Sequence, residues 1–438
     1  MKILSADYVL PVSSEPITGG AVAIYADKII AVGKAADIIK AFPDAQHKNF
    51  GEAAILPGFV NCHSHLEITS MRGLLDDVEH DFTAWLLKLT AARAKLSAEE
   101  IEAVAMTGAL EGVRAGVTCF GDIGRFGKAG FAALKATGLR GILFQETEFS
   151  PDDKTADEDF EKLKDKFLEL RESETELVKV GFSPHAPYTV SPKLFERIGE
   201  YAISENIKIS IHAAESTDEN ELMTLGTGFF SKHYEKFGVE WKSPHCSSIE
   251  YLERTGILRT KPLLVHCVTA SDSDISIIAA SASSIAHCPK SNAKFGHGYA
   301  PFEKFLDARI PVGLGSDSVA SNNVCDLLEE SRFAVLAARN MPDRKRFISA
   351  KEAIETATLG GAKALGLDNL IGTLEAGKQA DIAVVSLGST AQQPVNEIHA
   401  ALVFSSNACD VMMTIVAGND IFVDQIKFGQ FNLYKKHQ

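Results

Sequence analysis

The chain has 438 residues, of which 45% are hydrophobic, and its 44 Lys and Arg against 58 Asp and Glu give a formal net charge of −14. These values exclude low-complexity disorder, collagen-like sequence and a small disulfide-linked scaffold, and they indicate a packed globular protein. No basic run is present, and a nucleic-acid groove needs Lys and Arg against the phosphate backbone, so we expect no nucleic-acid partner. The expected partner is a small-molecule substrate.

The N-terminal sequence MKILSADYVL lacks the charged start, long apolar core and small-residue cleavage site of a secretory signal. No apolar stretch approaches the roughly 20 residues that cross a bilayer. The 7 Cys include no Cys-x-x-Cys pair. We therefore expect a cytoplasmic protein with no membrane partner.

The two ends of the chain resemble each other in pattern. Residues 2–12 and 21–33 nearly alternate apolar and polar positions, which is typical of strands. Similar β-rich runs, punctuated by Gly and Asn-Asp, return at 373–387 and 401–423. We predict that residues 1–55 and 372–438 together form one small β-sandwich domain.

Residues 56–371 alternate short apolar strands with longer amphipathic segments, which predicts an α/β fold, specifically a (β/α)8 TIM-like barrel. Helical segments are expected at 98–116 and 302–310, and residues 150–178 predict a charge-rich helix with a solvated outer face. The eight predicted strands are 55–63, 117–123, 140–146, 178–185, 207–212, 262–267, 283–288 and 310–317.

Six of these strands end on or next to a His or an Asp, and the active sites of such barrels lie at the C-terminal ends of the strands. The strongest local signal is the pair His63 and His65 in ILPGFVNCHSH. Residues i and i+2 of a strand point to the same side, so both imidazoles can bind one metal ion.

Two further motifs carry a His and carboxylates. In SIHAAES, His212 ends the fifth strand and Glu215 follows; a metal ligand beside a carboxylate suits hydrolysis, because the carboxylate can move protons between water and the leaving group. In GLGSDSVASNN, Asp317 ends the eighth strand, where it can bind a metal and accept a proton from water. Either motif alone could equally well have a purely structural role. The ordered set of His and Asp residues on strands one, five and eight is what indicates a metal site.

Four other histidines are candidates. His266 ends PLLVHC and is a candidate ligand, water-orienting base or core histidine. His185, in FSPHAPYTVS, is a candidate substrate contact, because the following Pro and Tyr indicate a fixed turn. His287, before CPKSN, could act directly in the active site or support another active-site residue. His297, in KFGHGYAP, is a loop residue that would close over a ligand.

The motifs PGFVNCHSHLE, FSPHAPYTVS, IHAAES, HCPKSN and GSDSVASNN occur in the order of the amidohydrolase superfamily. Over essentially the whole chain the sequence resembles its metal-dependent nucleoside and nucleobase deaminases. The resemblance implies a hydrolase of carbon–nitrogen bonds in cyclic amidines with one divalent metal. The implied ligands are His63, His65, His212 and Asp317.

The resemblance also implies catalytic roles. Glu215 would be the proton shuttle that protonates the ring nitrogen, while His266 would help to hold or deprotonate the water and would manage the second proton with Asp317. Members with two metals carry a carboxylated Lys at the end of strand four, where this chain has His185, so one ion is expected. Zinc is the default for these ligands and ferrous iron the alternative. A homodimer is expected by the same analogy.

The sequence resembles two branches of this superfamily: the methylthioadenosine/S-adenosylhomocysteine deaminases and the aminodeoxyfutalosine deaminases of menaquinone biosynthesis. The segment DFTAWLLKLTAARAKL, the strand end FQETEF and a long loop after strand five favour the second. The first branch implies an arginine near the end of strand three, where this chain has Gln145 and Glu146. Glu146 is a further substrate-contact candidate, Arg72 and Arg93 are candidates to meet an acidic substrate arm, and Trp85 either packs on its aromatic part or belongs to the core.

Two readings of other kinds stay open. A chlorohydrolase or guanine-type deaminase of the same superfamily would act on a triazine or a free base, and a substrate panel separates it. A non-enzymatic homologue would keep the barrel without chemistry, but lost catalysis usually leaves the metal set incomplete, and here the set is intact.

Overall fold

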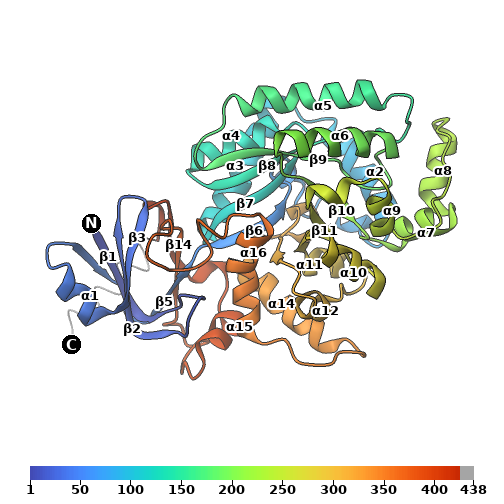
Figure 1. The fold of residues 1–438 in the computed structure, drawn as a ribbon. Helices are drawn as coiled ribbons and strands as arrows, with labels where there is room; N and C mark the ends of the chain where they lie inside the picture. The colour runs from blue at the N-terminus through green and yellow to red at the C-terminus, as the bar shows by residue number, and fades with distance from the viewer. Residues whose placement is uncertain (425–438) are drawn as a thin grey trace.

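The computed structural model describes residues 1–424, which form three sheets with helices packed against them (Figure 1). One eight-stranded sheet draws on both ends of the chain. Its strands are β1 (Lys2–Val9), β2 (Ile17–Tyr25), β3 (Lys28–Lys34), β4 (Gln46–Asn49), β5 (Ala53–Pro57), β14 (Ile382–Ser386), β15 (Val411–Val416) and β16 (Asn419–Val423). Residues 425–438 of the predicted terminal domain lie outside the described residues.

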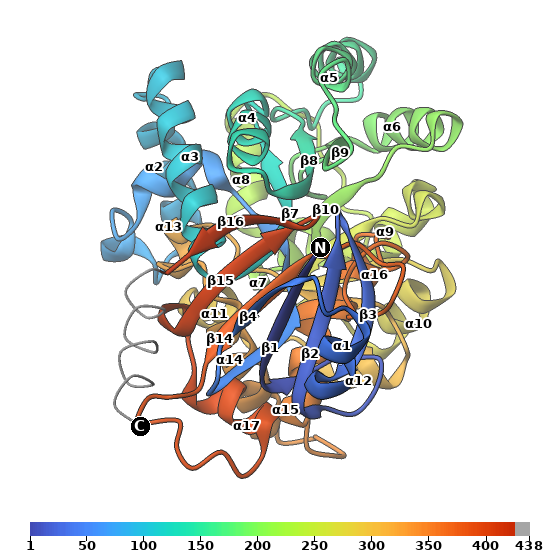
Figure 2. The ribbon, with the colours of Figure 1, turned by 90° about the vertical axis from the view of Figure 1, so that its left-hand side faces the viewer.

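In this terminal sheet, strands from opposite ends of the sequence are neighbours. The order is β16-β15-β14-β5-β1-β2-β3, with β4 also paired to β1 (Figure 2). β14 runs antiparallel to β5, with Ile382 opposite Pro57 and Val384 opposite Ile55. Ile55, Ile382 and Val384 belong to one buried apolar cluster with Leu4. β1 pairs with β2 on one edge and with β4 and β5 on the other, so the described strands make one hydrogen-bonded sheet. The predicted sandwich would have two sheets.

One predicted β-rich run is helical. α17 (Ile398–Ala400) continues into a π-helical turn at Ala401–Ser405, and Glu397 caps this segment by accepting hydrogen bonds from two backbone amides. Leu402 and Val403 are buried. A short apolar run has the same pattern in a buried helix and in a buried strand, so the β prediction for residues 401–405 is wrong. β15 and β16 confirm the later part of that run.

Two four-stranded parallel sheets occupy the middle of the chain, with orders β6-β7-β8-β9 and β10-β11-β12-β13. The predicted strand at 55–63 is divided at Gly58: residues up to Pro57 belong to β5 of the terminal sheet, and only the rest is in a parallel strand. The other seven predicted strands each overlap one of the observed parallel strands. The eight strands are β6 (Phe59–Ser64), β7 (Val117–Gly124), β8 (Arg140–Glu146), β9 (Val178–Ser183), β10 (Ser210–Ala213), β11 (Leu263–His266), β12 (Ser284–His287) and β13 (Val312–Leu314). Isolated parallel bridges, Phe182 to Ile209 and Ser64 to Asp317, connect the two sheets at both edges. The middle of the chain is therefore α/β with strands in sequence order.

Helices separate the strands. The predicted helix at 98–116 is α3, whose first turn is capped by Ser97 and Glu100, and the charge-rich segment is α5, with Phe160, Leu163 and Phe167 buried at helical spacing. None of the helices within residues 1–424 is long and apolar enough to cross a membrane. The helices are α1 (Ala35–Ala41), α2 (Phe82–Arg93), α3 (Ala98–Arg114), α4 (Lys128–Thr137), α5 (Ala156–Arg171), α6 (Pro192–Glu205), α7 (Thr217–Leu225), α8 (Gly228–Lys236), α9 (Ser248–Arg254), α10 (Asp272–Ala280), α11 (Pro289–Lys294), α12 (Phe302–Asp307), α13 (Val319–Asn322), α14 (Leu327–Asn340), α15 (Ala350–Glu355) and α16 (Gly361–Ala364).

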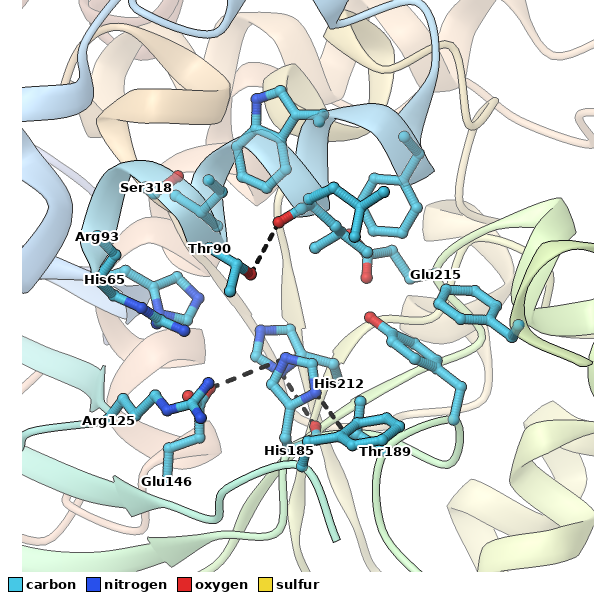
Figure 3. A pocket seen from close by; sticks show the side chains of 18 of the residues that line it. His65, Thr90, Arg93, Arg125, Glu146, His185, Thr189, His212, Glu215 and Ser318 are labelled. Carbon is cyan, nitrogen blue, oxygen red and sulfur yellow. Dashed lines mark hydrogen bonds and ion pairs between the residues drawn. The ribbon is translucent and has the colours of Figure 1, made fainter. Parts of the chain in front are cut away.

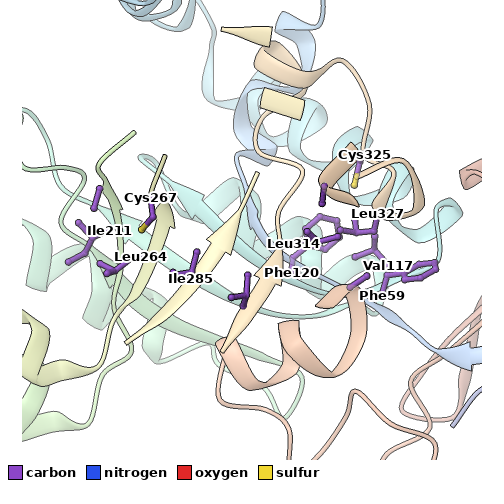
Figure 4. Packing of buried hydrophobic residues seen from close by; sticks show 14 of the residues in the cluster. Phe59, Val117, Phe120, Ile211, Leu264, Cys267, Ile285, Leu314, Cys325 and Leu327 are labelled. Carbon is purple, nitrogen blue, oxygen red and sulfur yellow. The ribbon is translucent and has the colours of Figure 1, made fainter. Parts of the chain in front are cut away.

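Strand residues alternate between two buried clusters. Ile211, Leu264 and Ile285 are register partners on successive strands and belong to the larger cluster, which also contains Leu327 of α14 (Figure 4). The next residue on β11, Val265, belongs to a second cluster that draws on both parallel sheets. The alternation follows from the two-residue period of a strand. The polar side chains gather at the carboxyl ends of these strands.

Candidate active site

Side chains from three strands and one strand-end loop converge at the carboxyl ends of the parallel sheets. His63 lies in β6 and His65 follows it, His212 lies in β10, and Asp317 lies just beyond β13. Nε2 of His63 is 3.2 Å from Oδ1 of Asp317, and Nε2 of His65 is 3.7 Å from the same oxygen. The ring centroids of His63 and His212 are 4.9 Å apart. With His266 at the end of β11, the four predicted ligands and one predicted catalytic histidine are brought together.

The donor atoms of this group fit one divalent metal ion. Nitrogen atoms of His63, His65 and His212 lie within 4.8 Å of one another, and so do ligand atoms of His63, His266 and Asp317. His63 is fully buried, yet neither of its ring nitrogens makes a hydrogen bond among the described residues; Nε2 only faces Asp317. Such a buried polar group is costly unless a cation satisfies it. Imidazole and carboxylate donors at this spacing suit zinc and related divalent ions.

Backbone carbonyls orient two of these imidazoles. Nδ1 of His65 donates to the carbonyl oxygen of Ile123, and Nδ1 of His212 donates to that of His185, each at 3.1 Å. Because a carbonyl oxygen only accepts, the proton is on Nδ1 and Nε2 keeps a free lone pair. Burial lowers the pKa of His65 to about 4 and that of His212 well below its ordinary value. Both rings are therefore neutral near pH 7, as metal binding requires.

Two serine hydroxyls hold the carboxylate of Asp317. Ser291 donates to its Oδ2 at 2.5 Å and Ser321 at 2.9 Å, while the amide of Ser318 donates to Oδ1 at 2.7 Å. Burial raises the pKa of Asp317, but the closeness of His63 and the other imidazoles outweighs this and holds the pKa well below its usual range. The carboxylate is therefore ionised, with Oδ1 turned towards the histidines.

Left-handed backbone conformations cluster at this site. Ala214, His266 and Asp317 have φ values of 52°, 73° and 56°. A non-glycine residue in this region costs about 1–3 kcal/mol and is found mainly where function requires it. The conformation turns the chain sharply at the ends of β10, β11 and β13, where the functional side chains lie.

Glu215 and His266 form an acid–base pair beside the metal ligands. Oε1 of Glu215 is 3.5 Å from Nε2 of His266, and Nε2 of His297 is 3.9 Å from the same oxygen. Nδ1 of His266 donates to Oδ1 of Asn292 at 2.9 Å, and its Nε2 is directed at Glu215. Burial raises the pKa of Glu215 to about 7, so the carboxyl can hold a proton near neutral pH.

A cavity of about 430 Å³ opens onto these residues (Figure 3). Its polar lining includes His65, His212, Glu215, His266 and Asp317. Its other walls are mostly apolar and come largely from α2, α8 and the loop before α12; they include Phe82, Trp85, Leu89, Phe149, Phe229, Phe230, Phe237 and Phe295. The site therefore accepts a polar reacting group with a larger apolar remainder.

Four of the five predicted substrate contacts line this cavity: Trp85, Arg93, Glu146 and His185. Nε2 of His185 lies 3.8 Å from Oε1 of Glu146, and burial lowers the pKa of His185 to about 3. Trp85 both lines the cavity and packs in a buried aromatic cluster, with its ring centroid 4.9 Å from that of Phe295. The core role left open by the sequence is therefore found, and the contact with a substrate stays a prediction.

Arg72 does not line the cavity. Its guanidinium forms an ion pair with Glu111 and donates to the carbonyl oxygen of Asn323. His287 is buried outside the cavity and stacks on Phe302 at 5.0 Å between ring centroids. His297 is buried beside Glu215 and packs edge-on against Phe82 at 4.7 Å.

Sequence reasoning missed Arg125, which follows β7 and lines the cavity beside Glu146 (Figure 3). It also missed the supporting roles of Ser291, Ser321 and Asn292. The signal for Arg125 was its place just past the predicted strand 117–123. The other three stand in the motifs CPKSN and SVASNN, but their contacts depend on side-chain directions that a motif does not specify.

A family model described as "Amidohydrolase family" matches residues 54–421. A 5-methylthioadenosine/S-adenosylhomocysteine deaminase from Moorella thermoacetica is 31% identical over 419 residues, covering 95% of this chain and 93% of that protein. A 5'-deoxyadenosine deaminase from Methanococcoides burtonii is 31% identical over 420 residues, covering 95% and 91%.

Solved structures share the fold along nearly the whole chain. A zinc-bound adenosine deaminase from Xanthomonas campestris has a TM-score of 0.83 and 26% identity, covering 99% of this chain and 98% of that one. An aminofutalosine deaminase from Helicobacter pylori, in complex with methylthio-coformycin, has a TM-score of 0.80 and 23% identity, covering 96% and 100%. Given these matches and the His and Asp group at the strand ends, the chain belongs to the amidohydrolase family and is a hydrolase of carbon–nitrogen bonds.

Proposed function

We propose that the protein is a zinc-dependent deaminase of adenine-type nucleosides that releases ammonia, with 6-amino-6-deoxyfutalosine as the preferred substrate. The observation that carries the deaminase assignment is the buried Glu215, whose pKa is about 7 and which faces His266 beside the metal-binding group. The names of the relatives from Moorella thermoacetica and Methanococcoides burtonii support the adenine-nucleoside class. Ferrous iron is the alternative ion, which metal analysis of the purified protein would distinguish.

The side chains supply the proton transfers. A zinc ion held by His63, His65, His212 and Asp317 would supply a water whose pKa is lowered towards about 7. Protonated Glu215 donates its proton to the ring nitrogen beside the amino-bearing carbon, which makes that carbon more electrophilic as water adds. Nε2 of His266 and the Asp317 carboxylate take up one proton of the added water and pass it to the amino group, which leaves as ammonia. The second proton of the water returns to the Glu215 carboxylate as the carbon–oxygen double bond forms. The product is the keto heterocycle.

The substrate's arm is inferred from two cations in the mostly apolar cavity. Arg93 and Arg125 both line it, and among residues 1–424 no ion pair or side-chain hydrogen bond is formed by either guanidinium. Burial lowers the pKa of Arg93, which reflects the cost of keeping this charge away from water. An apolar, aromatic arm that ends in a carboxylate would cover the aromatic wall and pair with the arginines. Aminodeoxyfutalosine has such an arm.

Two other substrates fit the cavity less completely. Methylthioadenosine and 5'-deoxyadenosine would leave both arginines unpaired, whereas S-adenosylhomocysteine would offer a carboxylate on a flexible, more polar arm. A free base or triazine, as in a chlorohydrolase or guanine-type deaminase, would leave most of the 430 Å³ cavity unfilled. We keep the methylthioadenosine/S-adenosylhomocysteine activity as the alternative, because the relatives carry that name.

The test is ammonia release by the zinc-loaded protein from adenosine, methylthioadenosine, S-adenosylhomocysteine and aminodeoxyfutalosine. A preference for aminodeoxyfutalosine supports the proposal, and equal or faster turnover of the sulfur nucleosides moves the protein to the alternative. Arg93→Met and Arg125→Met should each reduce kcat/KM for the carboxylate substrate by about tenfold or more, since each removes a charge-assisted pair. Arg72→Met is the matched control, because Arg72 lies outside the cavity.

We further propose that the two parallel sheets are the halves of one (β/α)8 barrel and that the terminal sheet is a separate small domain. The bridges at both edges of the parallel sheets support the first point. The terminal strands support a boundary after β5, close to the predicted one at residue 55. A homodimer, a cytoplasmic location and the absence of nucleic-acid and membrane partners stay predictions.

A further inference from the structure

The segment that carries the first two metal ligands is tied by hydrogen bonds to the end of β7. Asp122 Oδ1 accepts from the hydroxyl of Ser64 at 2.8 Å and from the amide of Leu66 at 2.9 Å. Nδ1 of His65 donates to the carbonyl oxygen of Ile123 at 3.1 Å. The segment from Ser64 to Leu66 and the end of β7 are therefore joined by three hydrogen bonds.

Glu67 extends this connection to the loop that carries Arg125. Its Oε2 accepts from the amide of Phe126 at 3.0 Å, and its Oε1 accepts from the amide of Gly127 at 2.6 Å. The Glu67 side chain is almost fully buried and does not line the cavity. Both of its oxygens are thus engaged by the backbone just after Arg125.

Gln145, at the end of β8, holds the same loop from the other side. Its Nε2 donates to the carbonyl oxygen of Arg125 at 2.9 Å, and the residue is fully buried outside the cavity lining. Gly127 has φ of 70°, and a Cβ there would lie 2.1 Å from Oε1 of Gln145; a Cβ at Gly124 would lie 2.8 Å from Oε1 of Glu67. Glycines on both sides of Arg125 therefore let the loop pack directly against these two side chains.

We propose that Glu67 and Gln145 are positioning residues that aim Arg125 into the cavity and so set selectivity for a substrate with an anionic arm. This inference rests on the proposed function of Arg125. The inference also gives Gln145 a role. Gln145 stands where the methylthioadenosine/S-adenosylhomocysteine branch implies an arginine, and here it holds an arginine that follows the neighbouring strand. Because Glu67 follows the metal ligand His65 by two residues, these contacts fix the span between the reacting centre and the cation, and with it the length of arm that fits.

Two variants test the inference in the zinc-loaded protein. Glu67→Gln keeps the shape but turns an N–H group towards one of the loop amides, and Gln145→Leu removes the bond to the Arg125 carbonyl. We expect amide hydrogen exchange at residues 124–127 to rise by about tenfold or more in each, since a lost bond of about 1.4 kcal/mol changes an equilibrium tenfold. Zinc content is measured in parallel.

The second readout is selectivity, the ratio of kcat/KM for aminodeoxyfutalosine to that for methylthioadenosine. Each variant should lower this ratio by about tenfold or more, towards that of Arg125→Met, with kcat for methylthioadenosine nearly unchanged. Glu174→Gln is the matched control: Glu174 also accepts a backbone amide, that of Val180 at 2.8 Å, but lies outside the cavity. Its exchange at 124–127 and its selectivity should match those of the unmodified protein.

Unchanged exchange at residues 124–127 in both variants would show that Glu67 and Gln145 do not hold the loop. Faster exchange with an unchanged selectivity ratio would overturn the positioning role. If the unmodified protein shows no preference for the carboxylate arm and Arg125→Met has no effect, the proposed role of Arg125 fails, and the selectivity role of its two supports fails with it. Should Glu67→Gln lose zinc, Gln145→Leu decides the matter, because Gln145 contacts no metal ligand in the described structure.

Discussion

Glu215 and His266 face each other across 3.5 Å, between Oε1 of the carboxyl and Nε2 of the imidazole. Asn292 accepts a hydrogen bond from Nδ1 of His266, so Nε2 is the ring nitrogen turned to Glu215. Burial gives Glu215 a pKa of about 7. A carboxyl that can hold a proton and an imidazole nitrogen therefore stand side by side where the cavity meets the metal-binding residues.

Glu215→Gln should keep the fold and the metal but lose about 10²–10⁴-fold in kcat, which is the range for removal of a general acid–base group. The amide is isosteric with the protonated carboxyl and cannot transfer its proton. Steady-state ammonia release together with zinc analysis measures both quantities. Glu221→Gln on α7, whose carboxylate accepts from the Thr227 hydroxyl outside the cavity, is the control. Unchanged turnover in Glu215→Gln would remove Glu215 from the mechanism.

Ser291→Ala should weaken zinc binding by about 10- to 100-fold, the range for partners that orient a metal ligand. Ser291 donates to Oδ2 of Asp317 at 2.5 Å, so its loss frees the carboxylate to rotate away from the histidines. Competition with a chromophoric chelator at pH 7 gives the affinity. Ser276→Ala on α10 should bind zinc normally, because within residues 1–424 the Ser276 hydroxyl donates to the carbonyl oxygen of Asp272 and to no other group. Equal affinities in the two variants would mean that Ser321 and Ser318 alone hold Asp317.

Glu330→Gln should make the stability of the zinc-loaded protein less dependent on pH. Glu330 is fully buried and accepts hydrogen bonds from Asn322 and from the amide of Lys290. Burial raises its pKa from 4.5 to about 8, partly opposed by Lys290. Between these values the folded protein binds more protons than the unfolded chain, so the free energy of unfolding falls as the pH rises.

The measurement for Glu330 is the change in Tm between pH 6 and pH 8. Tm should fall over this interval in the unmodified protein and fall less in Glu330→Gln. Asp122, with a pKa of about 8, and Glu67, with a pKa of about 7, act in the same direction, so the dependence should shrink without vanishing. An identical decrease in both proteins would mean that Glu330 is ionised in the folded state.

Arg140→Met should destabilise the protein by about 3–5 kcal/mol, because it leaves the Asp381 charge buried without its partner. Nε of Arg140 is 2.8 Å from Oδ2 of Asp381, both side chains are buried, and the pair joins β8 to the residue before β14. Unfolding in denaturant measures the loss. The double variant Arg140→Met with Asp381→Asn should lose less than the sum of the single variants.

The control for this pair is Arg171→Met, whose partner Glu205 lies 3.5 Å away on the exposed surface. An exposed ion pair contributes about 0–1 kcal/mol, so this variant should be nearly neutral. Equal losses for Arg140→Met and Arg171→Met would contradict the assignment of a buried charge.

The sequence predicted the parallel strands because each is a short apolar run with turn residues around it, as strands buried on both faces are. The grouping of the candidate metal-binding residues was predictable for the same reason, since His63, His212 and Asp317 stand at ends of strands that meet at one edge. The run at 401–405 was misread because five apolar residues carry no period that separates a helix from a strand.

Contacts made by loops were beyond sequence reasoning. Arg72 and Arg93 both come after the predicted first strand in the sequence. Only the fold shows that Arg72 forms an ion pair with Glu111 while Arg93 lines the cavity. Arg125 was missed because its direction depends on Glu67 and Gln145, which are distant in sequence from each other. The direction in which such a side chain points depends on tertiary packing, and it produces no periodic pattern in the sequence.

The pairing of β5 with β14 bears on the order in which the protein can fold during synthesis. The first strands to leave the ribosome include β5, but its partner is made only after the whole run of parallel strands and helices, and Asp381 reaches Arg140 at the same late stage. Until then the edge of β5 has unpaired backbone groups, which is the state most open to misassociation. We therefore expect nascent chains that stop before residue 382 to need a chaperone.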